Sequence, residues 1–270
     1  MLGWLRKLFV PPRAIPDGLW QATLSLYPFL TNRPSVDQNR LRTLTTHFLA
    51  QKQFSGAHGL VVTDEMAVAI AAQACLPVLN LGLKAYDDFE GIVIHPGAMV
   101  ARRSVVDAAG VHHFYKEVLA GEAMEGGPVT LSWQDVAASS EHLARGYNLV
   151  IHEFVHKLDM RDGAADGCPP LPTRAAKTQW QATMQAAYLL FQEQIAMAER
   201  FGAQLPWLDA YGATSPAEFF AVTSEAYFVN PNRFALDFAD LKVLFDTYFD
   251  SSMHAVSMAQ ALPNPPPPGV

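Results

Sequence analysis

Apolar residues recur every three or four positions in two stretches of the first third of the chain. The first runs from Ser35 to about Lys52, and the second runs from Asp64 to Cys75, just before Pro77. This spacing places the apolar side chains on one face, so both stretches predict helices. Before Ser35 the chain carries five prolines, which exclude a long helix there. We therefore expect an N-terminal arm over residues 1–34 and a helical scaffold over residues 35–84.

The pattern changes to short apolar runs between residues 91 and 133, separated by glycine and aspartate turns. These runs predict four strands, at residues 91–96, 100–106, 111–118 and 128–133. Helical spacing then returns over most of the remaining chain, at residues 134–139, 146–159, 173–200, 211–228 and 241–249. The pattern as a whole predicts an α+β fold that is mostly helical and contains a small mixed sheet.

The predicted helix at residues 146–159 is strongly apolar and contains the sequence His152-Glu153-x-x-His156. Residues four apart on a helix lie on the same face, so two imidazoles with this spacing can bind one metal ion. The glutamate between them misses the ion but reaches a water molecule bound to it, whose pKa a zinc ion lowers to about 7. The motif therefore predicts two zinc ligands, His152 and His156, and a general base, Glu153.

Two histidines on an apolar helix are, in many proteins, core residues that hydrogen-bond to the backbone. Here the flanking residues would bury the helix on most sides: Leu149, Val150, Ile151, Phe154, Val155 and Leu158. A buried face of histidine, glutamate and histidine is costly unless some group satisfies its polar atoms. This setting favours a metal site over a chance occurrence of the motif.

A catalytic zinc ion keeps three protein ligands and one position for water, so a third ligand is needed. Asp162 stands six residues after the second histidine, but position 159 lacks the glycine that would ease the necessary turn. Glu218 lies on a separate predicted helix, although Ser215-Pro216-Ala217-Glu218 is also a helix-capping pattern. Spacing favours Glu218, then Asp162, then Glu225, and leaves all three open. Asp159 fits better as an acceptor that orients a ligand histidine.

Composition mainly excludes classes of function. The formal net charge is −7, which argues against direct binding of nucleic acid. The two cysteines, Cys75 and Cys168, are far apart and do not form a disulfide framework, which indicates a reducing compartment. Pro11 and Pro12 end the apolar N-terminal stretch before it could form a signal or membrane span. We expect a cytoplasmic protein whose proline-rich tail, residues 256–270, is disordered.

Residues 148–159 and 211–228 together resemble the Mlc titration factor A (MtfA) family of zinc peptidases, and the likeness extends over most of residues 20–250. The second segment also looks like the active-site segment of anthrax lethal factor. The resemblance implies a zincin-like metallopeptidase core over residues 85–255, with one zinc ion per chain. It implies His152, His156 and Glu218 as ligands and Glu153 as the base. Tyr211 matches the tyrosine that, in anthrax lethal factor, stabilises the oxyanion of the tetrahedral intermediate.

The same resemblance implies aminopeptidase-like activity on peptides and binding to an Mlc-type transcriptional repressor. The alternative is a regulatory protein-binding module whose zinc site is idle or autoinhibited. Structural zinc sites normally have four cysteine and histidine ligands, and no cysteine lies near the motif, which favours an enzyme. In an enzyme of this kind an edge strand can pair with an extended substrate, and residues 129–132 are the predicted edge.

Overall fold

The computed structural model describes residues 12–106, 112–139 and 144–250. The apolar N-terminal stretch and the proline-rich tail lie outside the described residues. The helices are α2 (Asp17–Leu26), α3 (Ser35–Gln51), α4 (Asp64–Cys75), α5 (Trp133–Ala138), α6 (Leu149–Asp159), α7 (Arg174–Phe201), α8 (Pro216–Val229), α9 (Pro231–Asp237) and α10 (Ala239–Phe245). The strands are β1 (Gln53–Gly56), β2 (Gly91–His95), β3 (Met99–Val106), β4 (His112–Leu119), β5 (Gly121–Ala123) and β6 (Val129–Ser132).

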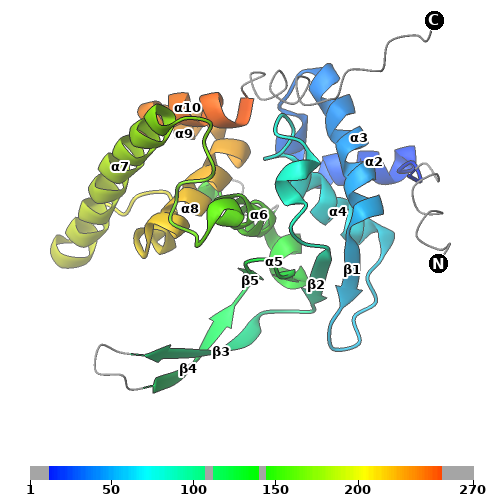
Figure 1. The fold of residues 1–270 in the computed structure, drawn as a ribbon, viewed down its shortest axis with the longest axis horizontal. Coiled ribbons are helices and arrows are strands. Elements are labelled where there is room, and N and C mark those ends of the chain that lie inside the picture. Colours follow the sequence, from blue (N-terminus) through cyan, green and yellow to red (C-terminus); the bar gives the residue numbers. More distant parts are fainter. Residues whose placement is uncertain (1–11, 107–111, 140–143, 251–270) are drawn as a thin grey trace, which may run out of the picture.

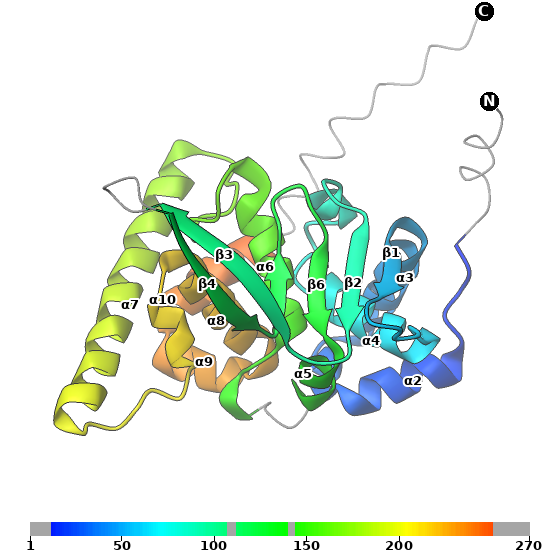
Figure 2. The ribbon, with the colours of Figure 1, turned by 90° about the horizontal axis from the view of Figure 1, so that it is seen from below.

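The strands form a four-stranded mixed sheet in the order β1-β2-β6-β5 and a separate two-stranded ribbon, β3-β4. Strands β1, β2 and β6 are parallel, and β5 pairs antiparallel with β6. The ribbon extends away from the helices in Figure 1 and crosses in front of α8 in Figure 2. The predicted α+β architecture, with many helices and a small mixed sheet, is confirmed.

Strand β6 is not the edge of the sheet, so the prediction that residues 129–132 form the edge was wrong. It lies between β2 and β5, and its residues Val129, Leu131 and Ser132 are fully buried. The edges are β1 and β5, and β5, which pairs with β6, has only three residues. A segment of this length is too short to show an alternating pattern, and for this reason the sequence did not reveal it.

Helix α6 lies at the centre of the molecule. In Figure 1 the helices α2, α3 and α4 lie on one side of it, and α7 to α10 lie on the other. All eleven residues of α6 are buried. One cluster of buried apolar side chains surrounds α6. It contains residues from Ile15 to Phe249, and some of them, between residues 15 and 30, belong to the predicted arm. The division of the chain into an arm, a scaffold and a core stays a prediction.

Side-chain contacts fix the start of α6. The side-chain oxygen of Asn148 accepts a hydrogen bond from the backbone N–H of Ile151 at 2.9 Å and so caps the helix. The amide nitrogen of the same side chain donates to Gln73 on α4 at 2.7 Å. Asn148 therefore sets both the first turn of α6 and its position against α4.

The longer predicted elements agree with the structure to within a few residues, whereas several shorter elements were missed. Helices α3, α4 and α7 begin and end close to the predicted limits, and α8 begins only at Pro216, after the capping residue Ser215. The elements that the sequence did not predict are α2, with ten residues, and the shorter β1, β5 and α9. In the part of the chain that the structure describes, no helix combines the length and the apolar character needed to span a membrane.

Phe154 on α6 tests the packing around the central helix. Its side chain is fully buried, and its ring contacts those of Phe48, Tyr86 and Phe89. We expect Phe154→Ala to lower the free energy of unfolding by about 3–5 kcal/mol, since the space cannot fully collapse. Urea denaturation measures this change. The matched control, Phe201→Ala, removes the same atoms from a side chain that is 74% exposed. It should change stability by less than about 0.5 kcal/mol, and equal losses in both variants would contradict the packing.

Candidate active site

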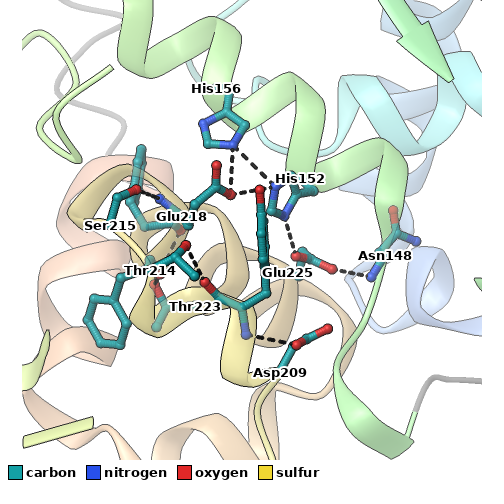
Figure 3. Close-up of polar contacts among 12 residues, drawn as sticks. Asn148, His152, His156, Asp209, Thr214, Ser215, Glu218, Thr223 and Glu225 are labelled. Carbon is teal, nitrogen blue, oxygen red and sulfur yellow. Dashed lines mark hydrogen bonds and ion pairs between the residues drawn. The ribbon is translucent and has the colours of Figure 1, made fainter. Parts of the chain in front are cut away.

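Three side chains from two helices meet at one point. His152 and His156 lie on α6, and Glu218 lies in the first turn of α8 (Figure 3). The two Nε2 atoms are 3.2 Å apart, and Glu218 Oε2 lies 3.0 Å from His152 Nε2 and 3.2 Å from His156 Nε2. Within the described ranges this is the one group of histidine, cysteine or acidic residues whose geometry could hold a metal ion.

The distances within this group fit a divalent metal ion. Around a tetrahedral zinc ion with bonds of about 2.0–2.1 Å, neighbouring ligand atoms are about 3.3 Å apart. The three observed separations, 3.0, 3.2 and 3.2 Å, are close to that value. Two unprotonated imidazole nitrogens facing each other repel unless they share a cation. The donor set of two imidazoles and one carboxylate is one that zinc commonly takes in catalytic sites.

Glu218 reaches the histidines because of where α8 begins. The hydroxyl of Ser215 accepts a hydrogen bond from the backbone N–H of Glu218 at 3.2 Å, and Pro216 occupies the first turn. The capping pattern seen in the sequence is therefore present, while the Glu218 carboxylate points to the histidines (Figure 3). Burial alone would raise the pKa of Glu218, but hydrogen bonds to both histidines lower it, so this carboxylate is ionised.

The other two candidate ligands lie elsewhere. Asp162 follows α6 in a short turn, its side chain is 43% exposed, and it forms an ion pair with Lys177 at 3.7 Å. Glu225 is buried behind His152, where its Oε1 accepts from Nδ1 of that ring at 2.7 Å. Its Oε2 accepts from the backbone N–H of Asn148. The contact between Glu225 and Nδ1 keeps the proton of a neutral His152 on Nδ1 and leaves the lone pair of Nε2 facing Glu218.

The predicted role of Asp159 in orienting a ligand histidine stays a prediction, and the histidine contact that the structure gives is made by Glu225. The Oδ2 atom of Asp159 accepts from the backbone N–H of Gly167 at 2.8 Å. Gly167 has a φ of +81°, and a Cβ there would lie 2.6 Å from the backbone oxygen of Pro216. Asp159 thus connects the end of α6 to the loop that packs on the first turn of α8. Burial raises the pKa of Asp159 to about 6.

The position of Glu225 near the histidines could have been predicted from its spacing along the sequence. Glu225 follows Glu218 by seven residues, which is two helical turns, so both side chains lie on the same face of α8. His152 and His156 lie one turn apart on α6. Two acidic residues on one face therefore oppose two histidines on the other helix. Asp159 has no comparable signal, because its contact depends on the fold of the loop at residue 167.

Glu153 and Tyr211 flank the three converging side chains. Glu153 is 5% exposed and accepts a hydrogen bond from the backbone of Ala123 on β5. Burial raises its pKa to about 7, although His152 acts in the opposite direction. Tyr211 lies on the short helix η5 (Ala210–Ala213), where Asp209 accepts from its backbone N–H. The Tyr211 ring is 45% exposed, and its centroid is 6.2 Å from that of His152. It therefore lies at the solvent side of the site.

A buried helix that brings two histidines and a glutamate to a carboxylate of a second helix, in an α+β fold, is the arrangement of a metallopeptidase. The family model described as glucose-regulated metallo-peptidase M90 matches residues 2–250, and the chain belongs to this family. The resemblance inferred from residues 148–159 and 211–228 is thereby confirmed.

Several relatives align with most of the chain. The Mlc titration factor A of Serratia proteamaculans (strain 568) is 38% identical over 250 residues, which cover 92% of each chain. That of Salmonella arizonae is 37% identical over 234 residues, covering 86% of this chain and 90% of the relative. That of Escherichia coli O9:H4 (strain HS) is 38% identical over 231 residues, covering 85% and 84%.

The choice between Glu218 and Asp162 as the third ligand can be tested by metal binding. Glu218→Ala should lower the affinity for zinc by more than about 100-fold, because even residues that only orient a ligand contribute 10–100-fold. Asp162→Ala removes a carboxylate of similar charge from the turn after α6 and should leave the affinity near that of the parent. Metal content and competition with a chelator measure both. The opposite outcome would make Asp162 the ligand.

Proposed function

We propose that this protein is a zinc-dependent peptidase with aminopeptidase-like activity, working in the cytoplasm. The observation that carries this proposal is the convergence of His152, His156 and Glu218 at 3.0–3.2 Å with the carboxylate of Glu153 beside them. The family supports a metal-dependent peptidase. Zinc is proposed because the donor set and its spacing suit this ion. The cytoplasm is proposed because both cysteines, Cys75 and Cys168, are free and buried.

In the proposed reaction the protein's own residues move the protons and stabilise the developing charge. A bound zinc ion supplies Lewis-acid chemistry, since it polarises a carbonyl and lowers the pKa of water. Glu153 accepts the proton of the attacking water and later donates it to the leaving amine. Burial, which raises the pKa of this carboxyl, favours its taking up the proton of the water at neutral pH. The hydroxyl of Tyr211 donates to the carbonyl oxygen as this atom becomes negative. Glu225 holds the ring of His152 in place through Nδ1.

The free edge of β5 is the proposed binding strand for an extended peptide. The backbone N–H of Ser132 donates to Ala120 at 2.7 Å, and that of Met124 donates to Pro128 at 3.4 Å. Since backbone groups alternate in direction along an antiparallel strand, Gly121 and Ala123 face away from β6, toward the free edge. A substrate could pair with the backbone N–H and C=O of Gly121 and with the C=O of Ala123, next to Glu153, which already accepts from the N–H of Ala123.

A regulatory role is the second proposal, since the relatives at 37–38% identity carry the name Mlc titration factor A. We propose that the protein also binds an Mlc-type repressor through protein contacts. A net charge of −7 is compatible with a partner that is a protein rather than DNA. The alternative, a binding module with an idle or autoinhibited metal site, differs from the peptidase in one measurable respect, which is turnover.

The peptidase proposal is tested with Glu153→Gln, which removes the base and keeps the size of the side chain. The parent should contain one zinc per chain and hydrolyse aminoacyl and short-peptide chromogenic substrates, and a chelator should abolish this activity. Glu153→Gln should retain zinc and lose at least about 100-fold in kcat. Full activity of the variant would show that Glu153 is not the base. A zinc-loaded parent without turnover would favour the binding module.

The role of Tyr211 predicts a separate effect. Tyr211→Phe should lower kcat by about 100-fold, because one hydrogen-bond donor to the oxyanion is lost, and it should leave the zinc content unchanged. Tyr27→Phe is a suitable control, since it also removes a tyrosine hydroxyl. The hydroxyl of Tyr27 is buried and donates to the backbone oxygen of Val136 at 3.3 Å. Loss of zinc from Tyr211→Phe would assign the tyrosine to metal binding instead of catalysis.

A further inference from the structure

Gly121 on the edge strand lies unusually close to Glu153. A Cβ atom at this position would lie 2.4 Å from Oε1 of Glu153, 2.7 Å from its Cγ and 2.8 Å from its Cδ. Cβ atoms in proteins essentially never approach other heavy atoms to less than 3.0 Å. The carboxylate of Glu153 therefore occupies the space that any side chain at position 121 would need.

The backbone conformation of Gly121 does not explain why this position is a glycine. Gly121 begins a strand, and its φ lies outside the left-handed region, so other residues could adopt its conformation. What distinguishes it is the contact with Glu153. A strand glycine in such a place marks a close approach of the backbone to another group.

Strand β5 cannot easily move away from Glu153. It pairs with β6 in a fixed register, Gly121 opposite Leu131 and Ala123 opposite Val129, and both partners are fully buried. The Ala123 backbone also forms a hydrogen bond to the Glu153 carboxylate. The strand thus holds the carboxylate by two means, a donor at Ala123 and an open space at Gly121.

We propose that Gly121 is a positioning residue for Glu153: its missing side chain forms the slot that holds the carboxylate against β5 and directed at the metal site. This inference rests on the proposed role of Glu153 as general base. Gly121 has no side chain that could touch the predicted ligands or the substrate, so any effect of its replacement on the reaction acts through Glu153. Its effect should therefore appear in the chemical step and not in metal binding.

Gly121→Ala should displace the carboxylate. Ordinary contact distances exceed 3.4 Å, so the carboxylate would have to move by about 1 Å from its present 2.4 Å. A displacement of this size at a reacting group can cost about 100-fold in rate. We expect kcat to fall by about 100-fold while KM stays within about twofold, because the backbone groups of the free edge are unchanged. The zinc content and the melting temperature should stay near those of the parent.

The contact itself is tested by a double-mutant cycle with Glu153→Asp. Aspartate is shorter by one methylene, which makes room for the new Cβ. If the two residues act through their contact, Gly121→Ala should cost little further activity in the Glu153→Asp background, although it costs about 100-fold in the parent. Gly18→Ala is the control, because a Cβ at this position on α2 would meet no atom within 4 Å. It should leave kcat and KM unchanged.

A crystal structure of Gly121→Ala provides a readout that does not depend on activity. The expected result is a displaced Glu153 carboxylate with β5 in its original register. A carboxylate in its original place, kcat within twofold of the parent, or independent effects in the double variant would each overturn the proposal. If Gly121→Ala does not fold but the double variant does, the contact is supported. If neither folds, Gly121 is needed for folding and the proposal fails.

The proposed function can fail separately from this inference. If Glu153→Gln is as active as the parent, Glu153 is not the base, and the enzymatic proposal must be abandoned. The crystal structure of Gly121→Ala would still show whether the glycine sets the position of the carboxylate. Conversely, an inactive Glu153→Gln together with a fully active Gly121→Ala would retain the peptidase mechanism and reject the role of Gly121.

Discussion

The structure depends on one constraint: a helix buried on all sides carries polar and charged side chains that must all find partners. Helix α6 contains five such residues, and each is at most 9% exposed. Leaving any of them unsatisfied would be costly in a site of low polarity. The partners come from separate parts of the chain: Glu218 and Glu225 on α8, Ala123 on β5, Asp88 before β2, and Gly167 in the loop before α7. Because the buried polar side chains of α6 require these partners, the elements that supply them pack around α6 and form the site.

The charges of this site also explain why a divalent cation suits it. Two buried carboxylates, Glu153 and Glu225, and the half-buried carboxylate of Glu218 lie around the same histidine, His152. Burial raises the pKa of Glu153 and of Glu225, while the histidines keep Glu218 ionised. Burial alone would lower the pKa of His152, but Glu218 and Glu225 raise it well above its ordinary value. Protons and a metal ion thus compete for the same lone pairs, so that binding of the metal would release protons.

The parts of the site that follow from the spacing of residues along one helix could be predicted from the sequence. His152, Glu153 and His156 are of this kind, because their geometry is set by the helix itself. Glu218 is not, since its spacing allowed both a capping and a ligand role, and the family resemblance favoured the latter. Contacts that depend on how separate elements pack were missed. The contact of Glu225 with His152 and that of Asp159 with Gly167 are of this kind, and β5 gave no pattern because it has only three residues.

If a peptide pairs with β5 as proposed, the three residues of this strand limit how many main-chain hydrogen bonds it can form. On the free side of the strand only Gly121 and Ala123 present main-chain groups, and the N–H of Ala123 is already used by Glu153. A peptide lying there would find a template two residues long, too short to attract the edges of other sheets. Main-chain hydrogen bonds to this strand would involve only a few residues of the peptide and would not depend on its remaining length. A long polypeptide would therefore gain no more main-chain hydrogen bonds from this strand than a short peptide does.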